Sequence, residues 1–265
     1  MCFDSKYPGK LPLPEDFSLR DTLNCGQCFR WNEQPDGSFS GWAGNRHASL
    51  IQIKNTLFLS DSDTAFWEDY LDLKADYREW KEQFKQDPAL SLAIDYCGGI
   101  RILRQDLWET TISFIISANN NIPRIKGIIN RLCTLFGEDG SFPTPDKLAS
   151  LTVEDLIPIR AGFRAKYILD AAAKITSGEV NLTALDALPL EKAEHELRKI
   201  NGIGPKVAQC VLLYSLHRLD AFPIDTWMKK VLERYYPNGL PDWINPRGVA
   251  QQYLFHYVRS LPSDD

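Results

Sequence analysis

The segment INGIGPKVAQC, residues 200–210, decides the fold because it predicts two helices joined by a very short turn. Gly202 and Gly204 permit positive φ angles and close backbone approach. Pro205 suits the first position of a helix, where its missing N–H is not needed. The flanking segments EKAEHELRKI and KVAQCVLLYSLH have helical hydrophobic periodicity. We therefore predict a helical hairpin over residues 191–217 whose second helix offers free N–H groups to a phosphate. An ordinary αα-turn has the same pattern, so both interpretations stay open here.

Lys206 and Asp225 stand at the starts of two predicted helices. The partial positive charge of a helix start disfavours the Lys206 ammonium by about 0.3–1 kcal/mol, which favours the neutral, nucleophilic amine. Asp225 follows the extended segment AFPI and suits a helix N-cap. The same carboxylate could stabilise an oxocarbenium-like sugar while a base departs. The pair therefore suits attack of an amine on an anomeric carbon.

Length and hydropathy set the class of protein. The 265 residues allow one large domain or two modest ones. No apolar run approaches the roughly 18 residues of a membrane span, so no membrane partner is expected. The first ten residues, MCFDSKYPGK, lack the apolar region of a secretory signal. We therefore expect a cytoplasmic protein of prokaryotic type.

The net charge of −5 and the pI near 5.5 argue against nucleic acid, but the distribution of charge does not. Residues 110–137 and 198–219 contain basic residues and no acidic ones. A polyanion responds to such local patches before it responds to the net charge. Ordinary solvated helix faces give the same pattern, so charge alone favours neither interpretation.

Hydrophobic periodicity divides the chain near residue 97. Asp36-Gly37 and Asn55 lie between strand-like runs and predict two β-hairpins. A less regular segment, residues 64–84, is expected to contain a helix. After Gly98-Gly99 the helical period dominates, and six helical segments are predicted at residues 107–118, 125–136, 166–176, 191–200, 205–217 and 226–236. This order predicts an α+β protein with a β-rich part, 1–97, and a helical part, 98–265.

The six cysteines do not form a zinc framework. They are Cys2, Cys25, Cys28, Cys97, Cys133 and Cys210. Only Cys25 and Cys28 form a C-x-x-C pair, and His47 is the nearest further candidate ligand. Structural zinc usually has four ligands, so reduced, mostly buried thiols are expected.

The hairpin LRKINGIGPKVAQCVLLYSL followed by PID resembles the helix-hairpin-helix (HhH-GPD) DNA glycosylase superfamily. Four further segments narrow the resemblance to the 8-oxoguanine DNA glycosylases: CGQCFRW, SANNNIPRIKGIINRLCTLFG, AGFRAKYI and GVAQQYLF. The resemblance spans nearly the whole chain in order. It implies an amino-terminal antiparallel sheet domain and a two-lobed helical domain. It also implies a bifunctional enzyme that excises 8-oxoguanine opposite cytosine and then cleaves the strand by β-elimination.

The resemblance implies a role for each matching residue. Lys206 matches the Schiff-base nucleophile and Asp225 the catalytic aspartate. The residues that match the base pocket are Gly26 (acceptor for the N7 hydrogen), Cys210 and Phe255 (stacking) and Gln251 (Watson–Crick edge). Those that match contacts to the opposite cytosine or to DNA are Asn119, Arg124, Arg164, Gly202, Gly204 and Trp227. Taken singly, most of these residues also suit ordinary core, turn or surface positions.

The resemblance also implies partners and cofactors. Double-stranded DNA containing 8-oxoguanine is the expected partner, and the protein is expected to be a monomer. No cofactor is expected to be required. The family's structural cation, monovalent or divalent, would contact backbone carbonyls at Arg198, Ile200 and Ile203.

Related families fit the sequence less well. Endonuclease III and the adenine-specific glycosylases usually end with four cysteines for an iron–sulfur cluster, and no cysteine follows Cys210. Alkylated-base glycosylases lack the hairpin lysine. A non-catalytic helix-hairpin-helix module is the alternative, but it needs neither Lys206 nor Asp225. Two departures from the family concern affinity: Trp227 replaces a histidine of the vertebrate-type enzymes, and Phe163 replaces a common tyrosine.

Overall fold

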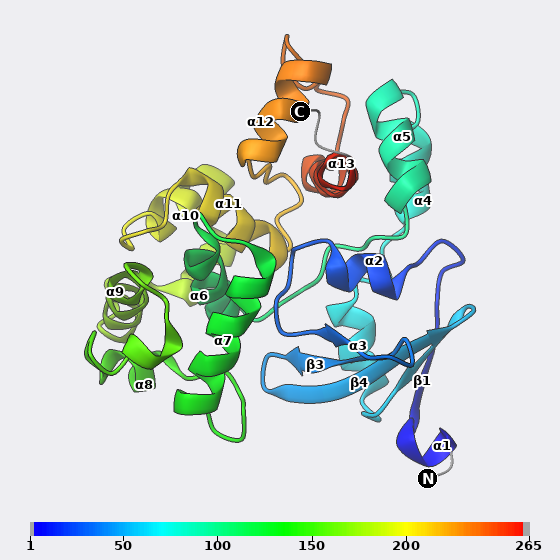
Figure 1. The fold of residues 1–265 in the computed structure, drawn as a ribbon. Coiled ribbons are helices and arrows are strands. Elements are labelled where there is room, and N and C mark those ends of the chain that lie inside the picture. The colour runs from blue at the N-terminus through cyan, green and yellow to red at the C-terminus, as the bar shows by residue number, and fades with distance from the viewer. Residues whose placement is uncertain (1–2, 262–265) are drawn as a thin grey trace.

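The amino-terminal part of the chain is built on an antiparallel sheet. In the computed structural model, which describes residues 3–261, the sheet has five strands in the order β1-β5-β4-β3-β2 (Figure 1). The strands are β1 (Gly9–Pro12), β2 (Asn32–Glu33), β3 (Phe39–Ala43), β4 (Arg46–Ile53) and β5 (Thr56–Leu59). Both predicted hairpins are confirmed, with turns at Gly37 (φ +79°) and at Asn55.

One face of the sheet packs against two short helices, α2 (Leu19–Asn24) and α3 (Thr64–Tyr70). Buried Leu50 and Leu59 from the sheet share this core with Leu23 of α2 and Trp67 of α3. The chain begins with another short helix, α1 (Phe3–Lys6). Residues 24–28 begin at the last residue of α2 and run between two cores: Cys25 packs in the core of the helical part, and Cys28 packs in the core of the sheet.

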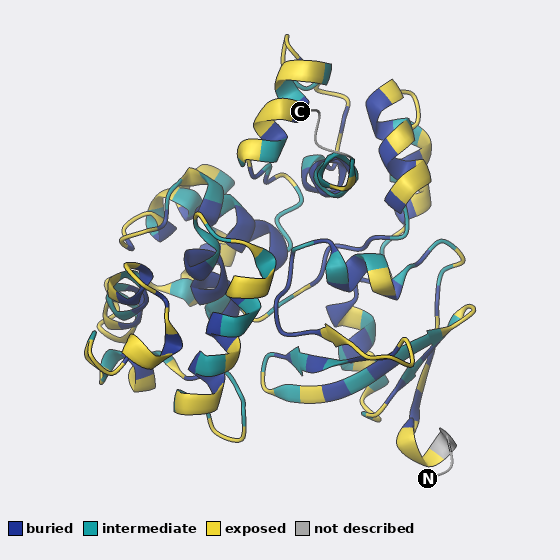
Figure 2. Cartoon of the chain, viewed as in Figure 1, coloured by how far each residue is buried: buried dark blue, intermediate teal, exposed yellow. Residues whose placement is uncertain are grey.

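The first helical lobe surrounds α6 (Leu107–Ser117), whose residues 109–116 are all buried (Figure 2). Helix α6 packs against α7 (Ile122–Phe136), α9 (Arg164–Thr176) and α11 (Pro205–Tyr214). The lobe is completed by α8 (Pro145–Ala149), α10 (Leu190–Leu197) and the short 3-10 helices at Ile157–Ile159 and Leu182–Ala187. Thr110 and Thr111 fit this buried helix because their hydroxyls donate to the carbonyls of Asp106 and Leu107.

The second helical lobe combines segments from both ends of the chain (Figure 1). Its helices are α4 (Tyr77–Phe84), α5 (Pro88–Cys97), α12 (Thr226–Tyr235) and α13 (Arg247–Ser260). α5 packs along α13, so a helix that precedes the expected boundary at residues 97 and 98 shares its core with the carboxy-terminal helix. The division into domains at that position stays a prediction.

The predicted helices are present, with shifted ends. The helix predicted at residues 191–200 ends at Leu197, because Gly202 adopts φ +86° and the preceding residues form the turn. The helix predicted at residues 205–217 ends at Tyr214. The sequence did not predict α1, α2, α5, α8 or α13. Residues 248–254 of α13 are all buried, which weakens its helical period, whereas the buried residues of α5 lie on one face. Among the described residues, no helix is long and apolar enough to cross a membrane.

Candidate active site

The hairpin between α10 and α11 is shaped by its glycines. Gly202 has φ +86°, and a Cβ there would lie 2.4 Å from the ring of Tyr167, so both conformation and space require glycine. Asn201 fastens the turn to α9 by two hydrogen bonds of 2.7 Å to the carboxylate of Asp170. Gly204 is the N-cap of α11 and supplies no side-chain cap. The first N–H groups of α11 therefore have no side-chain partner and are placed as in known phosphate-binding helix starts.

Lys206 lies in the first turn of α11, half-buried, with its Nζ 5.3 Å from the ring centroid of Phe114. One turn later Cys210 is buried on the same face of the helix. Burial raises the pKa of Cys210, while the charge of Lys206 and a hydrogen bond with it act in the opposite direction. The amine of Lys206 therefore lies beside a largely apolar wall formed by Phe114 and Cys210.

Asp225 is the N-cap of α12, as its position in the sequence predicts. Its side chain accepts a hydrogen bond from the backbone N–H of Met228 at 2.8 Å. This bond fixes the carboxylate at the end of α12, and Asp225 lines the same pocket as Lys206. The cap and the catalytic interpretations are therefore compatible.

A single pocket brings together all six residues assigned to catalysis and base binding. It is lined by Lys206, Asp225, Gly26, Cys210, Gln251 and Phe255, together with Phe114, Tyr214 and Pro223. Its volume is about 30 Å³, roughly the share of one water molecule in the liquid. A purine can therefore enter only when lining side chains move apart. Phe255 is half-buried at one wall, whereas Cys210 is buried on α11.

Gln251 carries a buried polar atom without a partner. The side chain is 3% exposed, and its Nε2 donates to the carbonyl of Pro223 at 3.2 Å. Its Oε1 has no hydrogen-bond partner among the described residues. Leaving a buried acceptor unpaired costs about 1–3 kcal/mol, so this atom favours a ligand that donates a hydrogen bond into the pocket.

Gly26 enters the pocket from the amino-terminal part of the chain. Its φ of +92° is unfavourable for other residues, and a Cβ would lie 2.8 Å from Nη1 of Arg259. Arg259 in turn lies over the ring of Phe255, with 5.1 Å from its Cζ to the ring centroid. The glycine therefore permits close contact between the segment 24–28 and α13 at the pocket wall.

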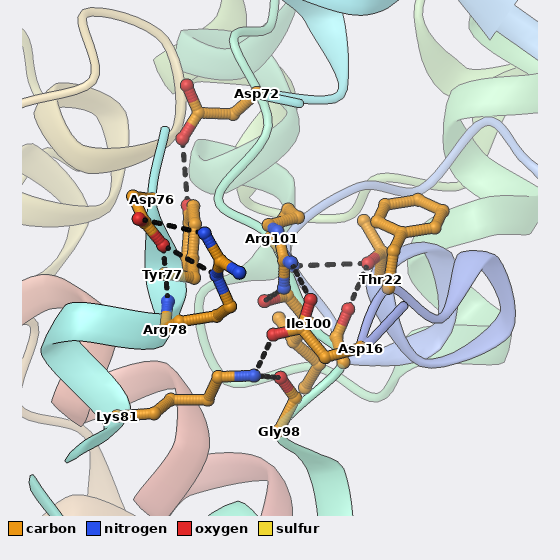
Figure 3. A network of polar contacts seen from close by, with 12 residues as sticks. Asp16, Thr22, Asp72, Asp76, Tyr77, Arg78, Lys81, Gly98, Ile100 and Arg101 are labelled. Carbon is orange, nitrogen blue, oxygen red and sulfur yellow. Dashed lines mark hydrogen bonds and ion pairs between the residues drawn. The ribbon is translucent and has the colours of Figure 1, made fainter. Parts of the chain in front are cut away.

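A polar network around Arg101 holds the other side of this segment (Figure 3). The backbone N–H of Arg101 donates to Oγ1 of Thr22 at 3.1 Å, and its carbonyl accepts from Nε2 of Gln27 at 2.8 Å. Its buried guanidinium donates to Asp16, which also pairs with Lys81. Burial opposes ionisation of Asp16, but hydrogen bonds and charge from Lys81 and Arg101 hold its pKa below the ordinary value. Gln27, next to Gly26, is therefore fixed by well-anchored backbone.

The predicted opposite-base residues lie together, outside the lining of this pocket. Asn119 follows α6 with φ +49°, and the exposed Arg124 lies in the first turn of α7, capped by Asn121. Arg164 is 2% exposed and donates to the carbonyls of Ala118 and Asn119, each at 2.9 Å. Burial and the charge of Arg124 lower the pKa of Arg164. Arg164 thus holds the turn that presents Asn119, and its contact with cytosine stays a prediction.

Trp227 and Phe163 occupy the two positions that depart from the family pattern. Trp227 is half-buried in the first turn of α12, and Nζ of Lys230 lies 5.2 Å from its ring centroid. Phe163 is 55% exposed, and Cζ of Arg164 lies 4.4 Å from its ring centroid. Both are placed as surface aromatic groups, and their contacts with DNA stay predictions.

Cys25 and Cys28 are buried and donate to backbone carbonyls of α2, those of Thr22 and Leu23. Burial raises the pKa of Cys25 to about 12 and also raises the pKa of Cys28. Among the described residues, no group of three or more histidine, cysteine, aspartate or glutamate side chains is placed to hold a metal ion. Cys2 lies outside the described residues.

Three residues line the pocket although the sequence analysis did not assign them to it: Phe114, Tyr214 and Pro223. Tyr214 could have been found, because Lys206, Cys210 and Tyr214 follow one another at intervals of four on a single helix face. Phe114 comes from α6, and no local pattern distinguishes it from the other buried residues of that helix.

Comparison with known proteins agrees with this geometry. Residues 10–111 match the model of the 8-oxoguanine DNA glycosylase N-terminal domain, and residues 112–248 match the HhH-GPD superfamily of base excision DNA repair proteins. The chain belongs to the 8-oxoguanine DNA glycosylase family of that superfamily. In this chain the pocket is lined by residues of both helical lobes and by Gly26 from the amino-terminal part.

Three relatives illustrate the range of similarity within this glycosylase family. An N-glycosylase/DNA lyase of Saccharomyces cerevisiae is 42% identical over 52% of this chain and 42% of its own length. The N-glycosylase/DNA lyase OGG1 of Arabidopsis thaliana is 32% identical over 89% of this chain and 70% of its own. The solved structure of the Clostridium acetobutylicum 8-oxoguanine glycosylase/lyase, in complex with double-stranded DNA containing cytosine opposite 8-oxoguanine, is 40% identical, covers 92% of each chain and has a TM-score of 0.86.

Proposed function

We propose that this chain is a DNA N-glycosylase and lyase that excises 8-oxoguanine opposite cytosine. The observation that carries the proposal is the shared pocket, in which the Lys206 amine and the Asp225 carboxylate adjoin the Cys210–Phe255 walls and the unpaired Oε1 of Gln251. The Clostridium relative was solved with cytosine opposite 8-oxoguanine, which supports the same substrate here. A non-catalytic DNA-binding module would have no use for this pocket.

The pocket suits a base that has left the DNA stack. Extruding a nucleotide requires a few kcal/mol of unstacking free energy. The free N–H groups at the start of α11, beside Gly202 and Gly204, bind backbone phosphates without added side-chain charge, which fits the acidic pI. Cys210 and Phe255 then stack on the two faces of the base. Gln251 accepts from its Watson–Crick edge, and the Gly26 carbonyl accepts from the N7 hydrogen that guanine lacks.

Catalysis follows from the two helix starts. The lone pair of the neutral Lys206 amine forms a bond to C1′ while the bond from C1′ to the base breaks, and the base leaves with that electron pair. The attacking nitrogen gives up one proton and the departing base takes one up, so the step balances. Asp225 stabilises the positive charge that develops on the sugar. Ring opening gives a Schiff base between Lys206 and C1′. Loss of a C2′ proton then expels the 3′ phosphate and nicks the strand.

The proposed opposite-base contacts come from Asn119, Arg124 and Arg164. Cytosine presents O2 and N3 as acceptors, and guanidinium groups donate only. Thymine instead presents a hydrogen at N3, and adenine presents an amino group. We therefore expect a preference for cytosine, with Arg164 both supporting the Asn119 turn and donating to the base.

We propose that the hairpin also holds a structural cation through backbone carbonyls of Arg198, Ile200 and Ile203. Arg198 is the C-cap of α10, where carbonyl groups carry partial negative charge. The Ile200 carbonyl accepts from the N–H of Ile203 at 3.1 Å and retains a second lone pair. Oxygen ligands of this kind suit a hard cation, which would screen phosphate repulsion. A monomeric state and a cytoplasmic location stay predictions.

Single-turnover kinetics test the proposed function. The native protein is mixed in excess with a duplex that carries 8-oxoguanine opposite cytosine, and base release is followed separately from strand cleavage. The proposal expects base release from this duplex and none from the same duplex with guanine at the site. Equal release from both duplexes, or release from neither, would contradict it.

A further inference from the structure

Tyr214, which lines the base pocket, forms a buried hydrogen-bonded pair with Gln252, which does not. Tyr214 is 4% exposed and Gln252 is fully buried, and the Tyr214 hydroxyl donates to Oε1 of Gln252 at 2.6 Å. Nε2 of Gln252 donates to the carbonyl of Cys25 at 3.3 Å. A carbonyl can only accept, so it must face the amide nitrogen, which leaves Oε1 for the tyrosine hydroxyl. The hydrogen bonds therefore define the orientation of the Gln252 amide.

The Cys25 carbonyl belongs to the peptide group that leads into Gly26. On the other side of Gly26, the carbonyl of Gln27 accepts from Nε2 of Gln105 at 2.8 Å. The Gln27 side chain is itself fixed, because Oε1 accepts from the N–H of Leu103 at 2.9 Å. Gly26, at φ +92°, is thus the flexible residue between two fixed groups. Gln252 supplies the fixed group on the amino-terminal side.

An aromatic layer links this pair to the nucleophile. The rings of Tyr214 and Phe114 are stacked, with centroids 5.4 Å apart and an interplanar angle of 18°. Phe114 also lies 5.3 Å from Nζ of Lys206. Phe114, which packs beside the Lys206 amine, therefore also positions the Tyr214 ring. The Tyr214 hydroxyl in turn positions Gln252 through their hydrogen bond.

We propose that Tyr214 and Gln252 act together as positioning residues that fix the direction of the Gly26 carbonyl, and so set how well the pocket recognises 8-oxoguanine. This inference rests on the function proposed above. The carbonyl must point at the N7 hydrogen of the base, and a shift of the Cys25–Gly26 peptide, which Gln252 holds, would displace the backbone of Gly26 and turn its carbonyl away. Gln252 does not line the pocket, so it acts through the two groups that it bonds, the Cys25 carbonyl and the Tyr214 hydroxyl.

Cleavage at a preformed abasic site separates this role from a general structural one. That reaction uses Lys206 but has no base for Gly26 to recognise. Gln252→Met keeps the approximate size of the side chain and removes both hydrogen bonds. We expect it to lower single-turnover excision of 8-oxoguanine about tenfold, the order expected for losing one well-formed hydrogen bond, and to change abasic-site cleavage by less than about twofold.

Two further variants complete the experiment. Tyr214→Phe removes the donor to Oε1 and should lower excision in the same direction, which keeps the test available if Gln252→Met does not fold. Tyr236→Phe is the matched control, because it removes another buried tyrosine hydroxyl, one that donates to Asp87 at 2.7 Å, and neither residue lines the pocket. It should leave both reactions at the native rates.

The outcomes distinguish the inference from the function on which it rests. If excision and abasic-site cleavage fall in parallel in Gln252→Met, the pair only maintains the fold and the inference is wrong. Excision equal to that of Tyr236→Phe would also overturn it. If the native protein cleaves abasic sites but does not excise 8-oxoguanine, the proposed function itself fails.

Discussion

Replacing Asp225 by asparagine separates its two roles, as helix cap and as catalytic carboxylate. The cap bond to the N–H of Met228, 2.8 Å long, can be made by an asparagine oxygen. Asparagine and aspartate are nearly equal N-caps, whereas alanine costs about 0.5–2 kcal/mol. Asp225→Asn should therefore leave the free energy of unfolding almost unchanged, and Asp225→Ala should lower it by about 1 kcal/mol.

The effect on chemistry should be much larger. A carboxylate about 4 Å from a cationic sugar stabilises it by about 4 kcal/mol at an effective dielectric constant of about 20. Losing that charge corresponds to a rate loss on the order of a thousandfold, since about 1.4 kcal/mol is a factor of ten. DNA affinity should change little, because Asp225 lines the pocket and does not belong to the turn that we propose to bind phosphate.

The assay combines thermal or denaturant unfolding, binding to uncleaved DNA and single-turnover base release. Asp76→Asn is a matched control, because Asp76 caps α4 through the N–H of Arg78 at an exposed site and does not line the pocket. It should behave as the native protein in all three measurements. If Asp225→Asn releases the base at the native rate per folded molecule, Asp225 is only a cap and the catalytic assignment is wrong.

Three further expectations concern recognition and thiol chemistry. Gln251→Ala should weaken discrimination among oxidised purines by roughly tenfold or more, from about 1–3 kcal/mol for an unpaired buried edge; unchanged selectivity in competition kinetics would refute the pocket assignment. Excision should be fastest opposite cytosine, and each other opposite base should cost on the order of 1–3 kcal/mol. The double variant Arg124→Ala, Arg164→Ala should excise at similar rates from four duplexes that differ only in the opposite base. A preference that persists in this variant would have to come from other residues. Burial raises the pKa of Cys25 to about 12 and also raises the pKa of Cys28, so both stay protonated thiols at pH 8 in the folded state. Iodoacetamide should therefore label the two cysteines only after unfolding, as measured by peptide mass mapping. Rapid labelling of the folded protein would contradict this expectation.

The sequence predicts the residues whose chemistry depends on local position. Lys206 and Asp225 stand at helix starts marked by Pro205 and by the cap itself, and Gly26 stands in a recognisable short segment. The α+β class follows from the change of hydrophobic period near residue 97. Family resemblance then joined these separate segments into one predicted site, and the structure places them around one pocket.

What the sequence could not predict depends on contacts between distant segments. The amide of Gln252 donates to the carbonyl of Cys25, which lies 227 positions earlier in the sequence. Helix α13 packs on α5, although the two helices are far apart in the sequence. No local period encodes such pairs. The support that Arg164 gives to the Asn119 turn was likewise hidden, because its hydrogen bonds go to backbone carbonyls that any residue could supply.

Borohydride trapping tests the central assignment, that Lys206 is the Schiff-base nucleophile, most directly. The native protein is incubated with a duplex carrying 8-oxoguanine opposite cytosine, reduced, and analysed for a covalent complex with DNA. The native protein should give a stable cross-link, mapped to Lys206 by peptide mass analysis. Lys206→Gln should bind the same duplex with little change in affinity and give no cross-link. An undiminished adduct in that variant would show that another amine performs the reaction.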